Sequence, residues 1–75
     1  MVGNNSQDEL ARAATLHRQG RLTEAIRAYR ELIARNPRNA RALNLLGLAC
    51  FANGELPAAV VAMRQALALM PDLPA

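Results

Sequence analysis

The sequence repeats itself with a period of 34 residues, and this period restricts the fold more than any other feature. Identical residues recur at this separation: Gly20 and Gly54, Leu22 and Leu56, Ala25 and Ala59, Ala28 and Ala62, Arg30 and Arg64, and Pro37 and Pro71. A period of this length with a glycine in its middle and a proline near its end is typical of helix-turn-helix repeats. Such hairpins bury their apolar faces only against one another. The sequence therefore predicts two stacked helical hairpins.

The composition agrees with a small helical core. Hydrophobic residues make up 52% of the 75 residues and aromatic residues only 3%. A core built from alanine, leucine, isoleucine, valine and methionine favours helices over sheets. A chain this short buries only about 60% of the surface that its unfolded form exposes, so it holds one simple domain.

Local signals place four helices. Ser6 and Glu9 have the spacing of a capping box, in which two side chains satisfy amide groups at a helix start. Gly20 and Gly54 suit the left-handed conformation that ends a helix, and the prolines of the repeat prevent continuation. The expected helices are residues 7–19, 23–36, 40–53 and 57–70.

The positive charge is concentrated in the first half of the chain. The formal net charge is +3, and all nine basic residues are arginines, eight of which lie within residues 1–41. Helical spacing predicts ion pairs on a solvated face: Asp8 with Arg12, Arg27 with Glu31, and Glu31 with Arg35. Phosphate binding needs unpaired cations on one face, and single strands also need stacking aromatics. Only the cluster of Arg35, Arg38 and Arg41 supports nucleic-acid binding, which is therefore the less favoured function.

The ingredients of catalysis are scarce. The chain has one histidine and one cysteine, no glycine-rich phosphate loop and no cluster of metal ligands. Cys50 and His17 would lie on adjacent helices, but Cys50 falls on the inward stripe with Leu43, Leu46 and Gly47, whereas His17 does not. We therefore expect no enzymatic activity, no cofactor and no metal.

The N-terminal residues lack a secretory signal pattern, and no run reaches the 18 or so apolar residues that a membrane span needs. A single cysteine allows no internal disulfide, which agrees with a reducing compartment. We expect a cytoplasmic protein without a membrane partner.

The second unit resembles a tetratricopeptide repeat through Leu43-x2-Leu46-Gly47-x2-Cys50, Ala59-x3-Met63 and Pro71. The first unit is similar but looser, with Arg12 where the family usually has leucine and Glu9 where it prefers tryptophan. The resemblance covers residues 6–73. It implies an all-α fold, a right-handed α-solenoid of two helix-turn-helix repeats with four antiparallel helices. The units would be residues 6–39 and 40–73, between a flexible N-terminus, 1–5, and a tail, 74–75. An unrelated four-helix bundle is the alternative.

The resemblance also implies a binding surface, because in this family the first helix of each hairpin lines a concave groove. The residues carried over to this groove are Gln7, Leu10, Ala14, His17, Arg18, Arg41, Asn44, Leu48, Phe51 and Ala52. Such a set can bury apolar side chains of a peptide, hydrogen-bond its backbone and bind a carboxylate. For Leu10 and Leu48, simple packing between neighbouring helices is an equal alternative.

The last expected helix is apolar nearly all round, with only Arg64 and Gln65 as polar residues. A helix without a polar face needs cover on more than one side, and repeat arrays end in polar caps. We expect residues of this helix to contact another repeat, namely Val60, Ala62, Leu67 and Leu69. The chain is then either the N-terminal part of a longer array, which we favour, or a complete protein that self-associates. The leading function is the binding of a protein or peptide.

Overall fold

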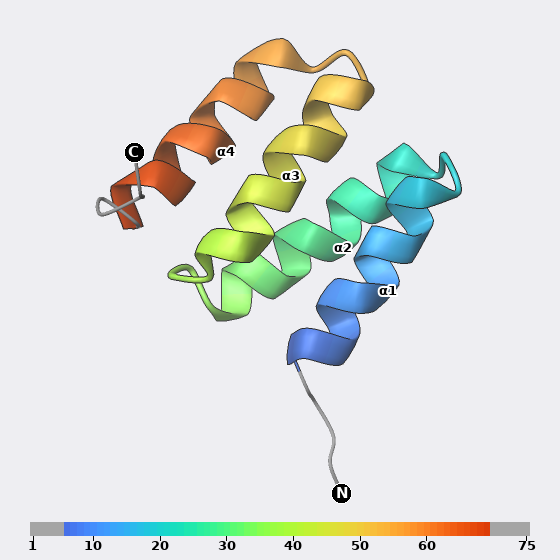
Figure 1. Ribbon diagram of the computed structural model, residues 1–75, viewed down its shortest axis with the longest axis horizontal. Coiled ribbons are helices and arrows are strands. Elements are labelled where there is room, and N and C mark those ends of the chain that lie inside the picture. Colours follow the sequence, from blue (N-terminus) through green and yellow to red (C-terminus); the bar gives the residue numbers. More distant parts are fainter. Residues whose placement is uncertain (1–5, 70–75) are drawn as a thin grey trace, which may run out of the picture.

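The computed structural model describes residues 6–69, which form four α-helices (Figure 1). The helices are α1 (Ser6–Arg18), α2 (Leu22–Arg35), α3 (Ala40–Ala52) and α4 (Leu56–Leu69). All four predicted helices are confirmed, and each end within the described residues lies within one residue of its expected position. The expected N-terminal segment 1–5, the helix end at residue 70, the stop at Pro71 and the tail 74–75 lie outside the described residues.

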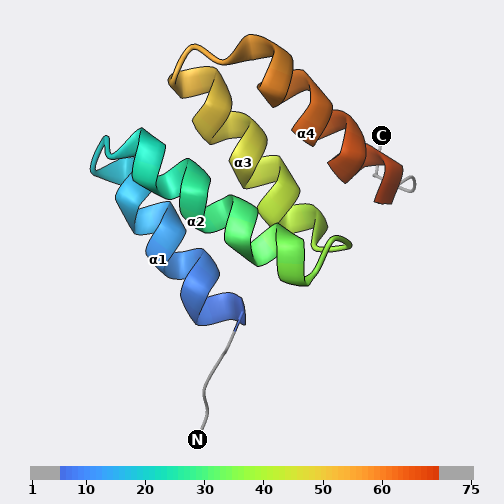
Figure 2. The same cartoon turned by 180° about the vertical axis from the view of Figure 1, so that it is seen from behind.

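The four helices lie in a row in which each runs antiparallel to the next (Figures 1 and 2). We call α1 and α2 the first hairpin and α3 and α4 the second hairpin. Helix α2 packs against α1 and α3, whereas α4, among residues 6–69, packs against α3 alone. Because α4 does not contact α1 in this part of the chain, the helices do not close into a four-helix bundle.

The two hairpins turn in the same way because each turn contains a glycine in the left-handed conformation. The φ angles are 81° at Gly20 and 79° at Gly54. In the first turn the Arg21 amide donates to the Leu16 carbonyl at 2.9 Å, and in the second the Glu55 amide donates to the Cys50 carbonyl at 2.8 Å. These hydrogen bonds satisfy carbonyl groups that a helix end otherwise leaves unpaired. The predicted role of both glycines is confirmed.

The connection between the hairpins is closed by a side-chain cap. Helix α2 ends at Arg35, just before Asn36 and Pro37, and Asn39 precedes α3. The Asn39 Oδ1 atom accepts a hydrogen bond from the Ala42 amide at 3.0 Å. This bond satisfies one free amide of the first turn of α3 and sets where that helix begins.

The core is built mainly from alanine and leucine, with one large aromatic side chain, Tyr29, which is fully buried. Small residues allow close helix packing. A Cβ atom placed on Gly47 of α3 would lie 2.5 Å from Met63 Cγ and 3.2 Å from the Ala59 carbonyl oxygen of α4. No larger residue fits at position 47 without displacing α4 or the Met63 side chain.

The charged residues pair differently from the prediction. Within the described residues the ion pairs are Arg35 with Glu9 and Arg21 with Glu24, the latter with Nε and Oε1 2.7 Å apart. The three predicted i, i+4 pairs do not form there. Arg35 lies at the end of α2 beside the start of α1, so the antiparallel hairpin brings it to Glu9. The Glu9 carboxylate therefore engages Arg35, and the expected capping box, which needs the Ser6 side chain, lies outside the described residues.

Candidate functional site

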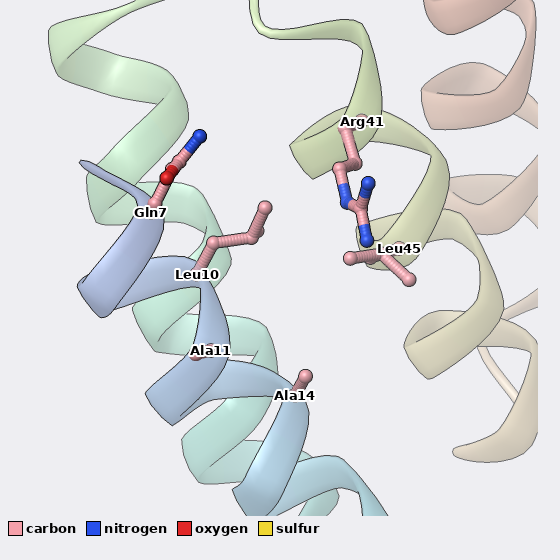
Figure 3. A pocket seen from close by; sticks show the side chains of 6 residues that line it. All are labelled: Gln7, Leu10, Ala11, Ala14, Arg41 and Leu45. Atoms are coloured by element: carbon pink, nitrogen blue, oxygen red, sulfur yellow. The ribbon is translucent and has the colours of Figure 1, made fainter.

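A pocket lies between the two first helices of the hairpins, α1 and α3 (Figure 3). Its volume is about 300 Å³. Gln7, Leu10, Ala11 and Ala14 line it from α1, and Arg41 and Leu45 line it from α3. The repeat positions two parallel helices next to each other, and the small side chains of Ala11 and Ala14 leave space between them.

Four of the ten residues carried over to the groove line this pocket: Gln7, Leu10, Ala14 and Arg41. Two further lining residues, Ala11 and Leu45, were not predicted. Both lie four positions after a predicted lining residue, at the edge of the predicted stripe. The i, i+4 spacing that accompanies every helical stripe is the signal that would have included them.

The pocket combines an apolar floor with a positive charge at its edge. Leu10 belongs to the core, being only 9% exposed, and Leu45 is half-buried. Arg41 is exposed and forms no hydrogen bond or ion pair with any described residue. Its guanidinium group is therefore available for a carboxylate, which arginine binds through two parallel hydrogen bonds.

The remaining residues of the predicted groove do not line the pocket but continue along the same two helices. On α1, His17 is half-buried and Arg18 is exposed. The Arg18 guanidinium donates a hydrogen bond to Thr15 Oγ1 at 3.2 Å. On α3 the predicted residues are all exposed: Asn44, Leu48, Phe51 and Ala52. Leu48 and Phe51 are 42% and 64% exposed, so neither is buried between helices in this chain.

This arrangement of two stacked pairs of antiparallel helices is matched by a known family. A family model described as tetratricopeptide repeat matches residues 9–74. The chain belongs to the tetratricopeptide repeat family. Repeats of this family generally mediate interactions between proteins and generally act as scaffolds without catalysis. A comparison with curated proteins finds no significant match.

The last helix of this tetratricopeptide repeat pair carries a second candidate surface. Val60 and Leu67 are 48% and 53% exposed, and Leu69 is half-buried. Ala62, in contrast, is only 3% exposed and belongs to the core. It therefore lies away from this surface, where the prediction had placed it. The face of α4 that contains Ala62 packs against α3. Leu56 is also exposed, and the prediction did not include it.

Cys50 is a free, fully buried thiol, as its place on the inward stripe predicted. Groups of three or more histidine, cysteine or acidic residues able to hold a metal ion are absent from residues 6–69. None of the described helices has the length and apolar character needed to cross a membrane.

Proposed function

We propose that the chain binds a segment of a partner protein in the groove between α1 and α3. One observation supports this proposal above the others: Arg41, which has no partner among the described residues, lies beside an apolar pocket floored by Leu10 and Leu45. A site that binds a peptide needs a pocket for a side chain and a polar group that orients the chain. The pocket and Arg41 supply both.

The chemistry of the pocket defines the preferred ligand. An aliphatic side chain suits the hollow between Leu10 and Leu45, and a nearby carboxylate of the peptide suits the Arg41 guanidinium. Farther along α3, the exposed side chains of Leu48 and Phe51 offer additional apolar contact. The ligand is therefore a short acidic and apolar segment.

Nucleic-acid binding has less support. The predicted arginine cluster depended on Arg35, Arg38 and Arg41 acting together. Arg35 is paired with Glu9, which removes one of the three cations from that cluster. A phosphate-binding surface gains affinity from several free cations on one face. Of the predicted cluster, only Arg38 and Arg41 remain.

A second candidate role, which is compatible with the first, is stacking of the C-terminal end on another helical repeat. The exposed residues of α4 support it, because a stripe of large apolar side chains in water is a common sign of a protein interface.

The groove is tested with peptides selected on the chain itself. A phage library of random peptides is selected on the 75-residue protein, and the affinity of a recovered peptide is measured by calorimetry. We expect peptides with an aliphatic residue near an acidic residue. Arg41→Glu should weaken binding by about tenfold or more, since it replaces attraction of a carboxylate with repulsion.

The matched control is Arg30→Glu on α2. Arg30 is exposed, lies on a helix that does not line the groove and undergoes the same change of charge. Binding should be unchanged in this variant. Peptides whose affinity falls equally in both variants would show a general attraction to positive charge, and the groove proposal would then be wrong.

A further inference from the structure

The exposed large hydrophobic side chains are distributed unevenly between the hairpins. Those with the greatest exposure in the described part of the chain all lie in the second hairpin: Leu48, Phe51, Leu56, Val60, Val61 and Leu67. Leu56, Val60 and Leu67 follow one another at helical spacing and form a single stripe along α4. We call Leu56, Val60 and Leu67 the tail stripe.

The tail stripe repeats a stripe that is covered in the first hairpin. Leu22, Ile26 and Ile33 occupy the positions on α2 that lie 34 residues earlier. Ile26 is only 7% exposed and belongs to the core, and Ile33 packs against that core. Helix α2 has α3 as a second neighbour, whereas α4 has no second neighbour among residues 6–69. The tail stripe therefore corresponds to a surface that packs against other helices in the first hairpin. Residues 6–69 contain no helix that covers it.

The opposite end of the molecule cannot supply that helix. Ala42, Leu46 and Ala49 of α3 are buried and belong to the core cluster that also contains residues of α1 and α2. At the equivalent positions, 34 residues earlier, α1 carries Asp8, Arg12 and Thr15. Asp8 and Arg12 are exposed. Stacking α1 of one copy on the tail stripe of another would bury both charges against aliphatic side chains, which is unfavourable.

Between the two ends of the stack, the surface of a second copy that matches the tail stripe is therefore the tail stripe itself. We propose that two copies pair through their tail stripes in an isologous dimer, with α4 of one copy packed against α4 and α3 of the other. This inference rests on the stacking role proposed for the C-terminal end and names what it stacks on. A contact of this kind is closed by its two-fold symmetry, so it ends at two chains and does not grow into a filament.

The charges near the tail stripe permit such a pairing. From Ala42 to Leu69 the charged residues are Glu55 and Arg64. The stripe itself contains neither. Two copies can therefore approach with aliphatic contact along the stripe, and each charged side chain can remain at the edge in water.

The test is the molar mass of the 75-residue chain, measured by sedimentation equilibrium from about 1 µM to about 500 µM. We expect a monomer of 8.1 kDa at the lowest concentrations and twice that mass at the highest, with no larger species. Leu67→Glu, and separately Val60→Glu, should weaken dimerisation by about 100-fold, since each brings a carboxylate into an apolar contact. Both side chains are about half exposed, so the helical circular dichroism should not change.

Gln65→Glu is the matched control, because Gln65 is exposed on the side of α4 opposite the tail stripe and gains the same charge. It should dimerise like the original chain. Equal weakening by Gln65→Glu and Leu67→Glu would overturn the assignment of the interface. Growth to larger species with concentration would overturn the closed symmetry.

A chain that remains monomeric at every concentration would overturn pairing with a second copy. Adding a third hairpin, a duplicate of residues 40–73 placed after residue 73, then separates this failure from a failure of the stacking role. An increased urea midpoint would show that the face still stacks on a repeat. An unchanged midpoint would overturn the stacking role as well, and the peptide groove would be unaffected by either result.

Discussion

Tyr29 lies completely inside the core, and its hydroxyl group has no hydrogen-bond partner within residues 6–69. Burial raises the pKa of this hydroxyl above its usual value because the charged phenolate is poorly solvated there, and the positive charge of Arg18 opposes the increase. A buried polar group without a partner reduces the free energy of unfolding. The ring, in contrast, stabilises the core, because Tyr29 is one of its largest fully buried side chains.

Tyr29→Phe should keep the ring and remove this cost. We expect the free energy of unfolding at pH 7 to increase by about 1 kcal/mol, measured by urea denaturation. A decrease of similar size would show that the hydroxyl makes a favourable interaction in solution.

The same residue predicts a dependence on pH. Its pKa is higher in the folded than in the unfolded chain, so its contribution to stability is complete below the unfolded pKa of about 10. Above that pH the unfolded chain loses the proton first, and stability falls as the pH rises toward the folded pKa. The decrease should be smaller in Tyr29→Phe. The chain has one tyrosine and no tryptophan, so tyrosinate absorbance follows this group directly.

At the scale of helices, α3 and α4 approach each other closely at Gly47. Gly47→Ala should lower the free energy of unfolding by about 1–2 kcal/mol, because the added methyl group overlaps Met63 and approaches the Ala59 carbonyl oxygen. The energy lost by this steric overlap is larger than the energy of about 1 kcal/mol that alanine gains over glycine through its higher helix propensity. Urea denaturation measures the change.

A double-mutant cycle identifies the cause of that loss. In a Met63→Ala background the penalty for Gly47→Ala should be smaller, because the nearest atom has been removed. Asn44→Ala, at an exposed site on the same helix, is the control and should change stability by less than about 0.5 kcal/mol. An increase in stability with Gly47→Ala would contradict the close approach.

Helix positions could be predicted from the sequence because local chemistry decides them. Gly20 and Gly54 end their helices through their own backbone conformation, without help from distant residues. The ion pair between Arg35 and Glu9 could not be predicted in this way, since 26 residues separate its partners and only the docking of α1 on α2 brings them together.

The candidate site shows the same limit. The resemblance carried Gln7, Leu10 and Ala14 over to the groove, but the sequence did not determine which edge of α1 turns toward α3. Ala11 and Leu45 were missed for this reason. Ala62 was placed on the wrong surface because an apolar residue on a helix apolar nearly all round can face either neighbour, and packing against α3 decides.

At the scale of the whole molecule, the two ends differ in character. The outer face of α1 presents Asp8 and Arg12, as a terminal cap does, whereas α4 presents Leu56, Val60 and Leu67. Between these ends, the parallel helices α1 and α3 leave the pocket that contains Arg41. The pocket between α1 and α3 and the exposed apolar side chains of α4 are therefore the two surfaces on which the proposals of peptide binding and assembly rest.

Nuclear magnetic resonance tests the central proposal most directly. Backbone amide shifts of the labelled 75-residue chain are recorded while a selected acidic and apolar peptide is added. If the groove is the binding site, the largest changes will occur on α1 and α3 near Leu10, Arg41 and Leu45, and the outer face of α2 near Arg27 and Arg30 will change little. Largest changes on α2, with α1 and α3 unaffected, would contradict the proposed function.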